Sequence, residues 1–161
     1  MIDETTRLRL NRLARLVERE LKHLQGTDAR LFVTPFTAQR ARELEADDAL
    51  AERVDAFVAR FGRLQDTLGD KLLPRYLAAL GEQTGANIDN LTRAERLGLI
   101  DSVDRWLELR RLRNRMIHEY VDDPAQLAEA LQAGHEGVIE LKRAAKRILE
   151  DMKRRGWHEG P

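Results

Sequence analysis

The sequence contains no cysteine and few aromatic residues, and each shortage excludes a class of protein. Without cysteine there is no disulfide framework, no thiolate zinc site and no cysteine nucleophile. Aromatic residues make up only 5% of the chain, whereas Leu, Ala, Arg and Glu are abundant, which favours helices over sheet. No apolar run is long enough to span a membrane, and no secretion signal precedes the first charged residues, so a cytoplasmic protein is expected.

The chain also lacks an excess of either charge: 28 basic residues balance 28 acidic ones, and the formal net charge is zero. A nucleic-acid-binding protein of this composition would need a local basic patch, because the whole chain exerts no attraction on phosphates. Its 161 residues are enough for one domain with a sizeable core, and no linker or repeat divides them.

Apolar residues recur at spacings of three and four, which predicts an all-α, up-and-down bundle of four to five helices. We expect the first long helix to end near Gly26, and Pro74 to kink or break the second. Gly62 and Gly69 should let another helix come close. Asp123 and Pro124 are typical of a helix start, as N-cap and first helical residue. Long helices are expected at about 3–24, 48–80, 102–118 and 124–155, short ones at about 38–45 and 90–99, and a frayed tail at 157–161.

Sequence signals for a resident metal or cofactor are missing. No His-x-x-x-His pair occurs, and the glycines of residues 81–90 are too sparse for a phosphate-binding loop and lack the Lys-Ser/Thr that follows one. No serine is flanked by glycines, as the nucleophile of many hydrolases would be. We therefore expect neither a metal site nor a cofactor.

Side chains that could take part in catalysis are concentrated at the end of the third long helix, in Arg113-Asn114-Arg115-Met116-Ile117-His118-Glu119-Tyr120. Cleaving RNA without a metal requires a group that moves the 2′-hydroxyl proton and a cation that holds the phosphate. His118 titrates near working pH and can move the proton. Arg113 offers a planar fork of donors for phosphate oxygens, with Asn114 beside it. Tyr120 could stack on a base or bond to a phosphate.

Helical spacing complicates this site. His118 lies five positions after Arg113, which places the two about 140° apart on a regular helix. Either the helix loosens near Met116–His118, or a second subunit completes the site. In a purely structural role, His118 would cap helix carbonyls and Arg113 would pair with Asp104 or Glu108.

The same helix is rich in arginine between residues 105 and 115. Its arginines, among them Arg110 and Arg115, form either a solvated face or a basic path that leads phosphates to His118.

Arg113, Asn114, His118 and Tyr120 together resemble the signature of the HEPN superfamily, within it most closely the HepT toxins. The resemblance covers roughly residues 91–152 and is weak before Asp48. The first 46 residues, a helix and a connector, exceed a minimal HepT-like domain. Their helix either joins the bundle or covers the cleft.

This resemblance implies a symmetric dimer that cuts RNA without metal and leaves a cyclic phosphate. Arg113 and His118 would be catalytic, whereas Asn114 and Tyr120 would contact the substrate. Arg110 and Arg115, from the basic face of the same helix, are expected to contact it as well. A partner nucleotidyltransferase, the antitoxin, would silence the toxin by transferring AMP to Tyr120. Two other functions fit the sequence: a non-catalytic nucleotide-binding or regulatory subunit of a nucleotidyltransferase, and a helical protein–protein adaptor that uses the apolar seam of its last helix.

Overall fold

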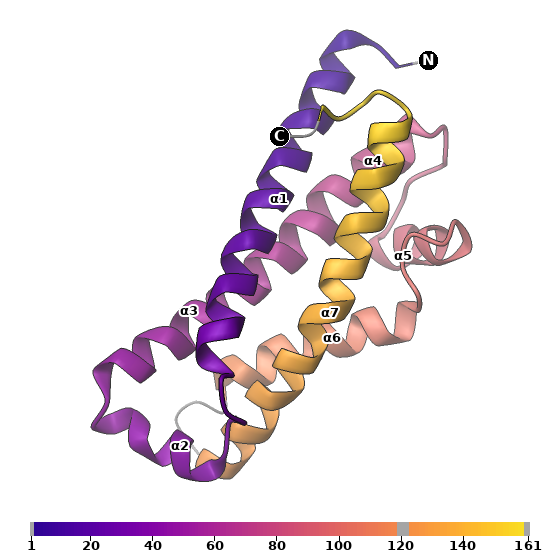
Figure 1. Cartoon of the computed structure of the whole chain (residues 1–161). Coiled ribbons are helices and arrows are strands. Elements are labelled where there is room, and N and C mark those ends of the chain that lie inside the picture. Colours follow the sequence, from indigo (N-terminus) through magenta and orange to yellow (C-terminus); the bar gives the residue numbers. More distant parts are fainter. Residues whose placement is uncertain (1, 119–122, 160–161) are drawn as a thin grey trace.

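The computed structural model describes residues 2–118 and 123–159, and the regular secondary structure in these ranges is entirely helical (Figure 1). The all-α prediction is confirmed. Within the described residues the helices number six rather than four to five, counting residues 48–79 as one continuous helix, because two short helices fold beside the four long ones. The elements are α1 (Glu4–Leu31), α2 (Ala38–Arg42) with the 3-10 turn η1 (Glu43–Glu45), α3 (Asp48–Asp66) continued by η2 (Thr67–Leu72) and α4 (Leu73–Ala79), α5 (Asn87–Arg96), α6 (Val103–His118) and α7 (Pro124–Arg154).

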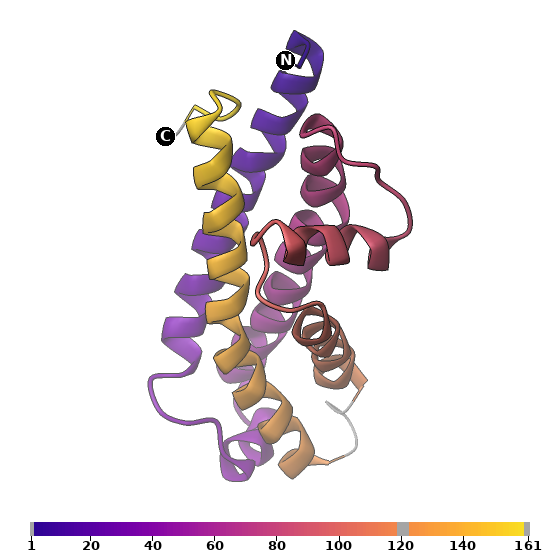
Figure 2. The same cartoon turned by 90° about the vertical axis from the view of Figure 1, so that its right-hand side faces the viewer.

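The four long helices pack side by side with alternating chain direction (Figure 1). α1 and α6 each pack against both α3 and α7, and they lie at opposite corners of the bundle (Figure 2). The first helix therefore belongs to the bundle. Within the described residues, every helix is too short or too polar to cross a membrane.

The apolar stripes read from the sequence form the core of this bundle. Leu10, Val17 and Leu24 of α1 are fully buried, as are Phe57 and Phe61 of α3. Each such side chain contributes roughly 1.5–3 kcal/mol by leaving water, so the stripes decide which helix faces pack inward.

α1 continues about two turns beyond Leu24, its predicted last residue, and stops at Leu31. The Thr27 hydroxyl is buried and accepts a hydrogen bond from the Arg60 guanidinium of α3, and Leu31 is fully buried. These tertiary contacts outweigh the helix-weakening effect of Gly26, which costs only about 1 kcal/mol.

Pro74 does not break the second long helix, contrary to one of the predicted outcomes. The helix widens into a π turn over Thr67–Leu72, in which the Leu73 N–H donates to the Leu68 carbonyl five residues back. This wider turn accommodates a proline, which has no N–H to donate, without interrupting the helix. It also leaves Asp70 exposed, on the side that faces α6.

Residues 157–159 do not fray as predicted but dock on α1. The His158 side chain is fully buried, with Nδ1 2.9 Å from Asn11 Oδ1 and Nε2 2.5 Å from Glu18 Oε1. The Trp157 ring packs edge-on against Tyr76 at 5.9 Å. Contacts between residues so distant in sequence hold the tail in place, and no local pattern could reveal them.

Glu20 of α1 is buried, and only one of its oxygens has a partner among the described residues: Oε1 accepts from the Thr67 hydroxyl at 3.0 Å. Burial raises the pKa of Glu20, although the Thr67 hydrogen bond opposes the shift. Because the folded pKa lies above the unfolded one, ionised Glu20 costs stability as pH rises through that interval.

We therefore expect Glu20→Gln to stabilise the protein at neutral pH by roughly 1 kcal/mol, the scale of one poorly solvated polar group. The gain should shrink as pH falls through the raised pKa of the folded state and should be gone below about 4.5, the usual pKa of a glutamate, where the carboxyl is neutral in both the folded and the unfolded protein. Urea unfolding of both proteins at several pH values measures this, and a gain that does not change with pH would contradict it.

Candidate functional site

α6 carries most of the predicted site, and glycines on both of its neighbours let it come close. Gly62 and Gly69 face it from the α3–η2 helix, and Gly134 and Gly137 face it from α7. A Cβ added at Gly137 would lie 2.6 Å from Leu109 of α6. The prediction that Gly62 and Gly69 admit a neighbouring helix is confirmed, and the helix they admit is α6.

Arg113 is held against α3 in a fixed position. Its Nη1 donates to Asp66 Oδ1 at 2.9 Å, and its guanidinium lies over Gly62, where an added Cβ would be 2.9 Å from Cζ. About a third of the Arg113 side chain stays exposed. The guanidinium is therefore oriented by one carboxylate while part of it still faces solvent.

Arg110 is paired in the same way, one turn earlier on α6. Its Nη2 donates to Asp70 Oδ1 at 2.5 Å, and Asp70 also accepts from Asn87 Nδ2 at 3.0 Å. The sequence reading missed Asp66 and Asp70. Asp66 and Asp70 lie four residues apart, about one helical turn, and Arg110 and Arg113 lie three apart, also about one turn. On antiparallel helices such acids and arginines can pair one to one, and this complementarity is the sequence signal that could have revealed the two acids.

The alternative partners proposed for Arg113 within α6 are wrong. Arg113 binds Asp66 rather than Asp104 or Glu108, and Glu108 instead pairs with Arg105 at 3.0 Å. An ion pair to α3 fixes the side chain relative to another helix, which a pair inside α6 could not do.

The other predicted site residues lie at or beyond the end of α6. Asn114 and Arg115 are exposed. His118 is the last residue of α6, one turn after Asn114, and its side chain and all of Tyr120 lie outside the described residues. Because α6 stays α-helical through His118, the alternative of a loosened helix does not hold. Arg113 and His118 thus remain about 140° apart around the helix axis.

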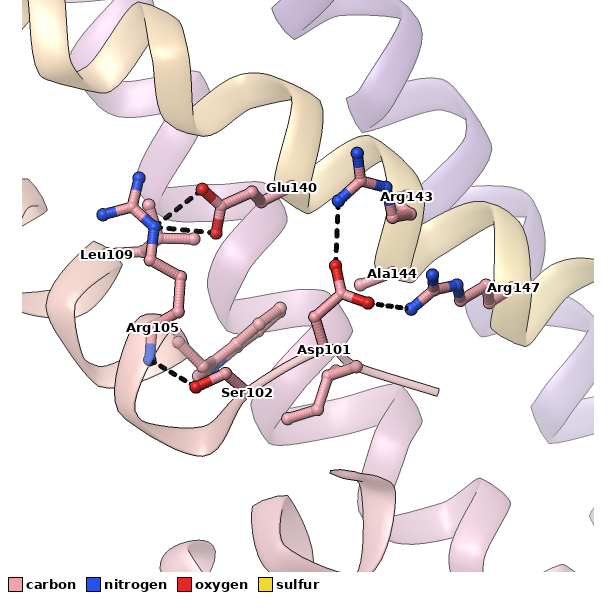
Figure 3. Close-up of a pocket in the computed structure, with 10 residues that line it drawn as sticks. Asp101, Ser102, Arg105, Leu109, Glu140, Arg143, Ala144 and Arg147 are labelled. Atoms are coloured by element: carbon pink, nitrogen blue, oxygen red, sulfur yellow. Dashed lines mark hydrogen bonds and ion pairs between the residues drawn. The ribbon is translucent and has the colours of Figure 1, made fainter. Parts of the chain in front are cut away.

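Around the start of α6, arginines of α6 and α7 are paired with acids (Figure 3). Arg105 donates to Glu140 at 2.6 Å, and Asp101 accepts from Arg147 at 2.6 Å and Arg143 at 2.8 Å. The hydrogen bonds from Arg147 and Arg143 lower the pKa of Asp101. The hollow among these groups holds about 20 Å³, which is room for a water rather than a substrate.

The sequence matches no protein-family model, no curated protein and no solved structure. In the described part of the chain, no three His, Asp or Glu side chains lie close enough together to hold a metal ion.

Proposed function

We propose that this protein is a metal-independent ribonuclease of the HEPN type and the toxin of a HepT-like toxin–antitoxin pair. One observation carries the proposal: Arg113 is oriented by Asp66 over Gly62, directly before exposed Asn114 and one helical turn or so before His118. A guanidinium that holds the phosphate and an imidazole that moves the proton are the groups that metal-free RNA cleavage requires, and the Asn114 amide can assist them.

In this reaction His118 accepts the 2′-hydroxyl proton, and the 2′ oxygen attacks the adjacent phosphorus. The bond from phosphorus to the 5′ oxygen breaks, and this oxygen takes up a proton. The products are a 2′,3′-cyclic phosphate and a 5′-hydroxyl. Arg113 stabilises the charge that builds on the phosphate, using the guanidinium donors that Asp66 does not occupy.

The proposed enzyme is a symmetric dimer. The regular helix through His118 supports this part of the proposal, since one chain cannot easily aim Arg113 and His118 at the same phosphate. A second copy would supply the missing partner across a shared cleft. Asn114, Arg115 and Tyr120 would contact the RNA, and Arg110 would do so after releasing Asp70. Transfer of AMP to Tyr120 by a nucleotidyltransferase antitoxin would block that cleft.

The direct test is to incubate the purified protein with RNA in excess EDTA and analyse the product ends. We expect cleavage to persist, and the 3′ ends to resist a phosphomonoesterase until acid opens the cyclic phosphate. Intact RNA, or cleavage that stops in EDTA, would overturn the proposal. RNA or nucleotide binding without cleavage would assign the non-catalytic role instead.

A further inference from the structure

The outward face of α1 is exposed and carries cations without acids. We call Arg12, Arg15, Arg19 and Lys22 the α1 ridge, and all four are exposed. The acidic residues of α1 are directed elsewhere: their carboxylates bind Arg7 (Glu4), His158 (Glu18), Thr67 (Glu20) and His135 (Asp28). The chain is neutral as a whole, yet this face is strongly basic.

The ridge cations are not neutralised by neighbours. Among the described residues, none of the four forms an ion pair, in contrast to Arg110 and Arg113 on α6. Steps of three and four residues keep them on one side of the helix, over a length of about 15 Å. Four uncompensated charges in one row raise the local potential far more than the net charge suggests.

α7 extends this basic surface along its seam with α1. His135 and Lys153 of α7 contact α1, at 2.7 Å from Asp28 and 3.9 Å from Glu18. Helical periodicity places Lys142 and Lys146 on the same stripe of α7, between these two contacts. The lysines that α7 adds to the basic surface are therefore Lys142, Lys146 and Lys153. Cations of two adjacent helices thus line one seam of the bundle.

We propose that the α1 ridge, together with the lysines of this seam, binds the phosphodiester backbone of RNA. The choice of RNA rests on the proposed ribonuclease function. α1 contains no Phe, Tyr or Trp on which bases could stack, so the contact should depend on backbone charge and not on sequence. A protein partner is a poorer fit, because protein interfaces centre on an apolar patch, and the large apolar side chains exposed beside this surface, Leu8 of α1 and Ile139 of α7, are single residues on separate helices.

The ridge lies on the far side of the bundle from the proposed cleavage site. α1 and α6 occupy opposite corners, so the two surfaces are separated by two helix diameters, on the order of 20 Å (Figure 2). A trinucleotide at Arg113 cannot reach the ridge, whereas a long RNA can contact both surfaces or bridge two copies of the chain. The ridge should therefore strengthen binding of long RNA only.

Fluorescence anisotropy with a 2′-O-methylated RNA hairpin, which cannot be cleaved, tests the proposal. The ridge variant is Arg12→Gln/Arg15→Gln/Arg19→Gln. The control variant, Arg42→Gln/Arg53→Gln/Arg96→Gln, removes the same charge from exposed arginines outside the ridge. We expect the ridge variant to lose at least about tenfold in affinity near 0.1 M salt, and its log–log salt slope to fall by about 2. The control should bind like wild type.

Equal affinity and equal salt slope in the two variants would overturn the proposal, as would absence of RNA binding by the wild type. The proposal would also be overturned if the ridge variant lost binding to an acidic protein but kept wild-type affinity for RNA. Cleavage of a trinucleotide separates this inference from the ribonuclease proposal: the ridge variant should cut it at the wild-type rate. If neither the trinucleotide nor a long RNA is cut but hairpin binding still depends on the ridge, only the ribonuclease proposal fails.

Discussion

Arg113→Ala and His118→Ala are each expected to slow RNA cleavage by a factor on the order of 10²–10³, the usual effect of losing a charge-stabilising donor or a general acid–base. Arg113→Lys should recover only part of the activity, because an ammonium keeps the charge but not the planar fork that binds Asp66 and a phosphate together. Single-turnover cleavage of one RNA by all variants measures the effect. Arg96→Ala, at an exposed arginine of α5, is the matched control.

Loss of stability should not explain the result. The Arg113–Asp66 pair is partly exposed on both sides, and such pairs contribute about 0–1 kcal/mol. The melting temperature of Arg113→Ala should therefore stay within a few degrees of wild type. If both alanine variants cut RNA about as fast as wild type, neither residue is catalytic and the ribonuclease assignment is wrong.

Burial patterns made most of the fold predictable. Leu10, Val17 and Leu24 predicted their helix, because apolar residues at this spacing lie on one face of a helix and that face is buried in the core. The misses are places where distant contacts outweigh local preference. Gly26 suggested a helix end, yet the buried bond between Thr27 and Arg60 carries α1 onward. Pro74 suggested a kink or a break, yet the helix continues because the π turn before it accommodates a residue that has no N–H to donate.

The candidate site was predictable only in part, for a similar reason. The spacing of Arg113, Asn114 and His118 predicts a site at the end of α6. It did not reveal Asp66, because that pairing depends on the antiparallel register of α3 and α6, which sequence periodicity leaves free. The docking of His158 on Glu18 was hidden for the same reason, since the two residues lie at opposite ends of the chain.

The close approach of α3 and α6 at Gly62 leads to the second prediction with a large expected effect on cleavage. In Gly62→Ala the new Cβ would overlap the Arg113 guanidinium, 2.9 Å from Cζ. The end of a long side chain can move aside, and alanine is better than glycine in a helix by about 1 kcal/mol, so the fold should keep its stability. The displaced guanidinium should nevertheless leave Asp66, and cleavage should fall at least about tenfold, since a misplacement near 1 Å can cost 10²-fold.

Gly26→Ala is the matched control for this experiment. It makes the same substitution inside a helix, but its Cβ would meet only the end of Arg30, at 3.4 Å, far from Arg113. We expect Gly26→Ala to raise the melting temperature slightly and to leave cleavage unchanged. Thermal melts and single-turnover rates of both variants separate helix propensity from the position of Arg113. If Gly62→Ala cut RNA as fast as Gly26→Ala, the placement of the Arg113 guanidinium by Asp66 and Gly62 would not matter for cleavage, and this prediction would be wrong.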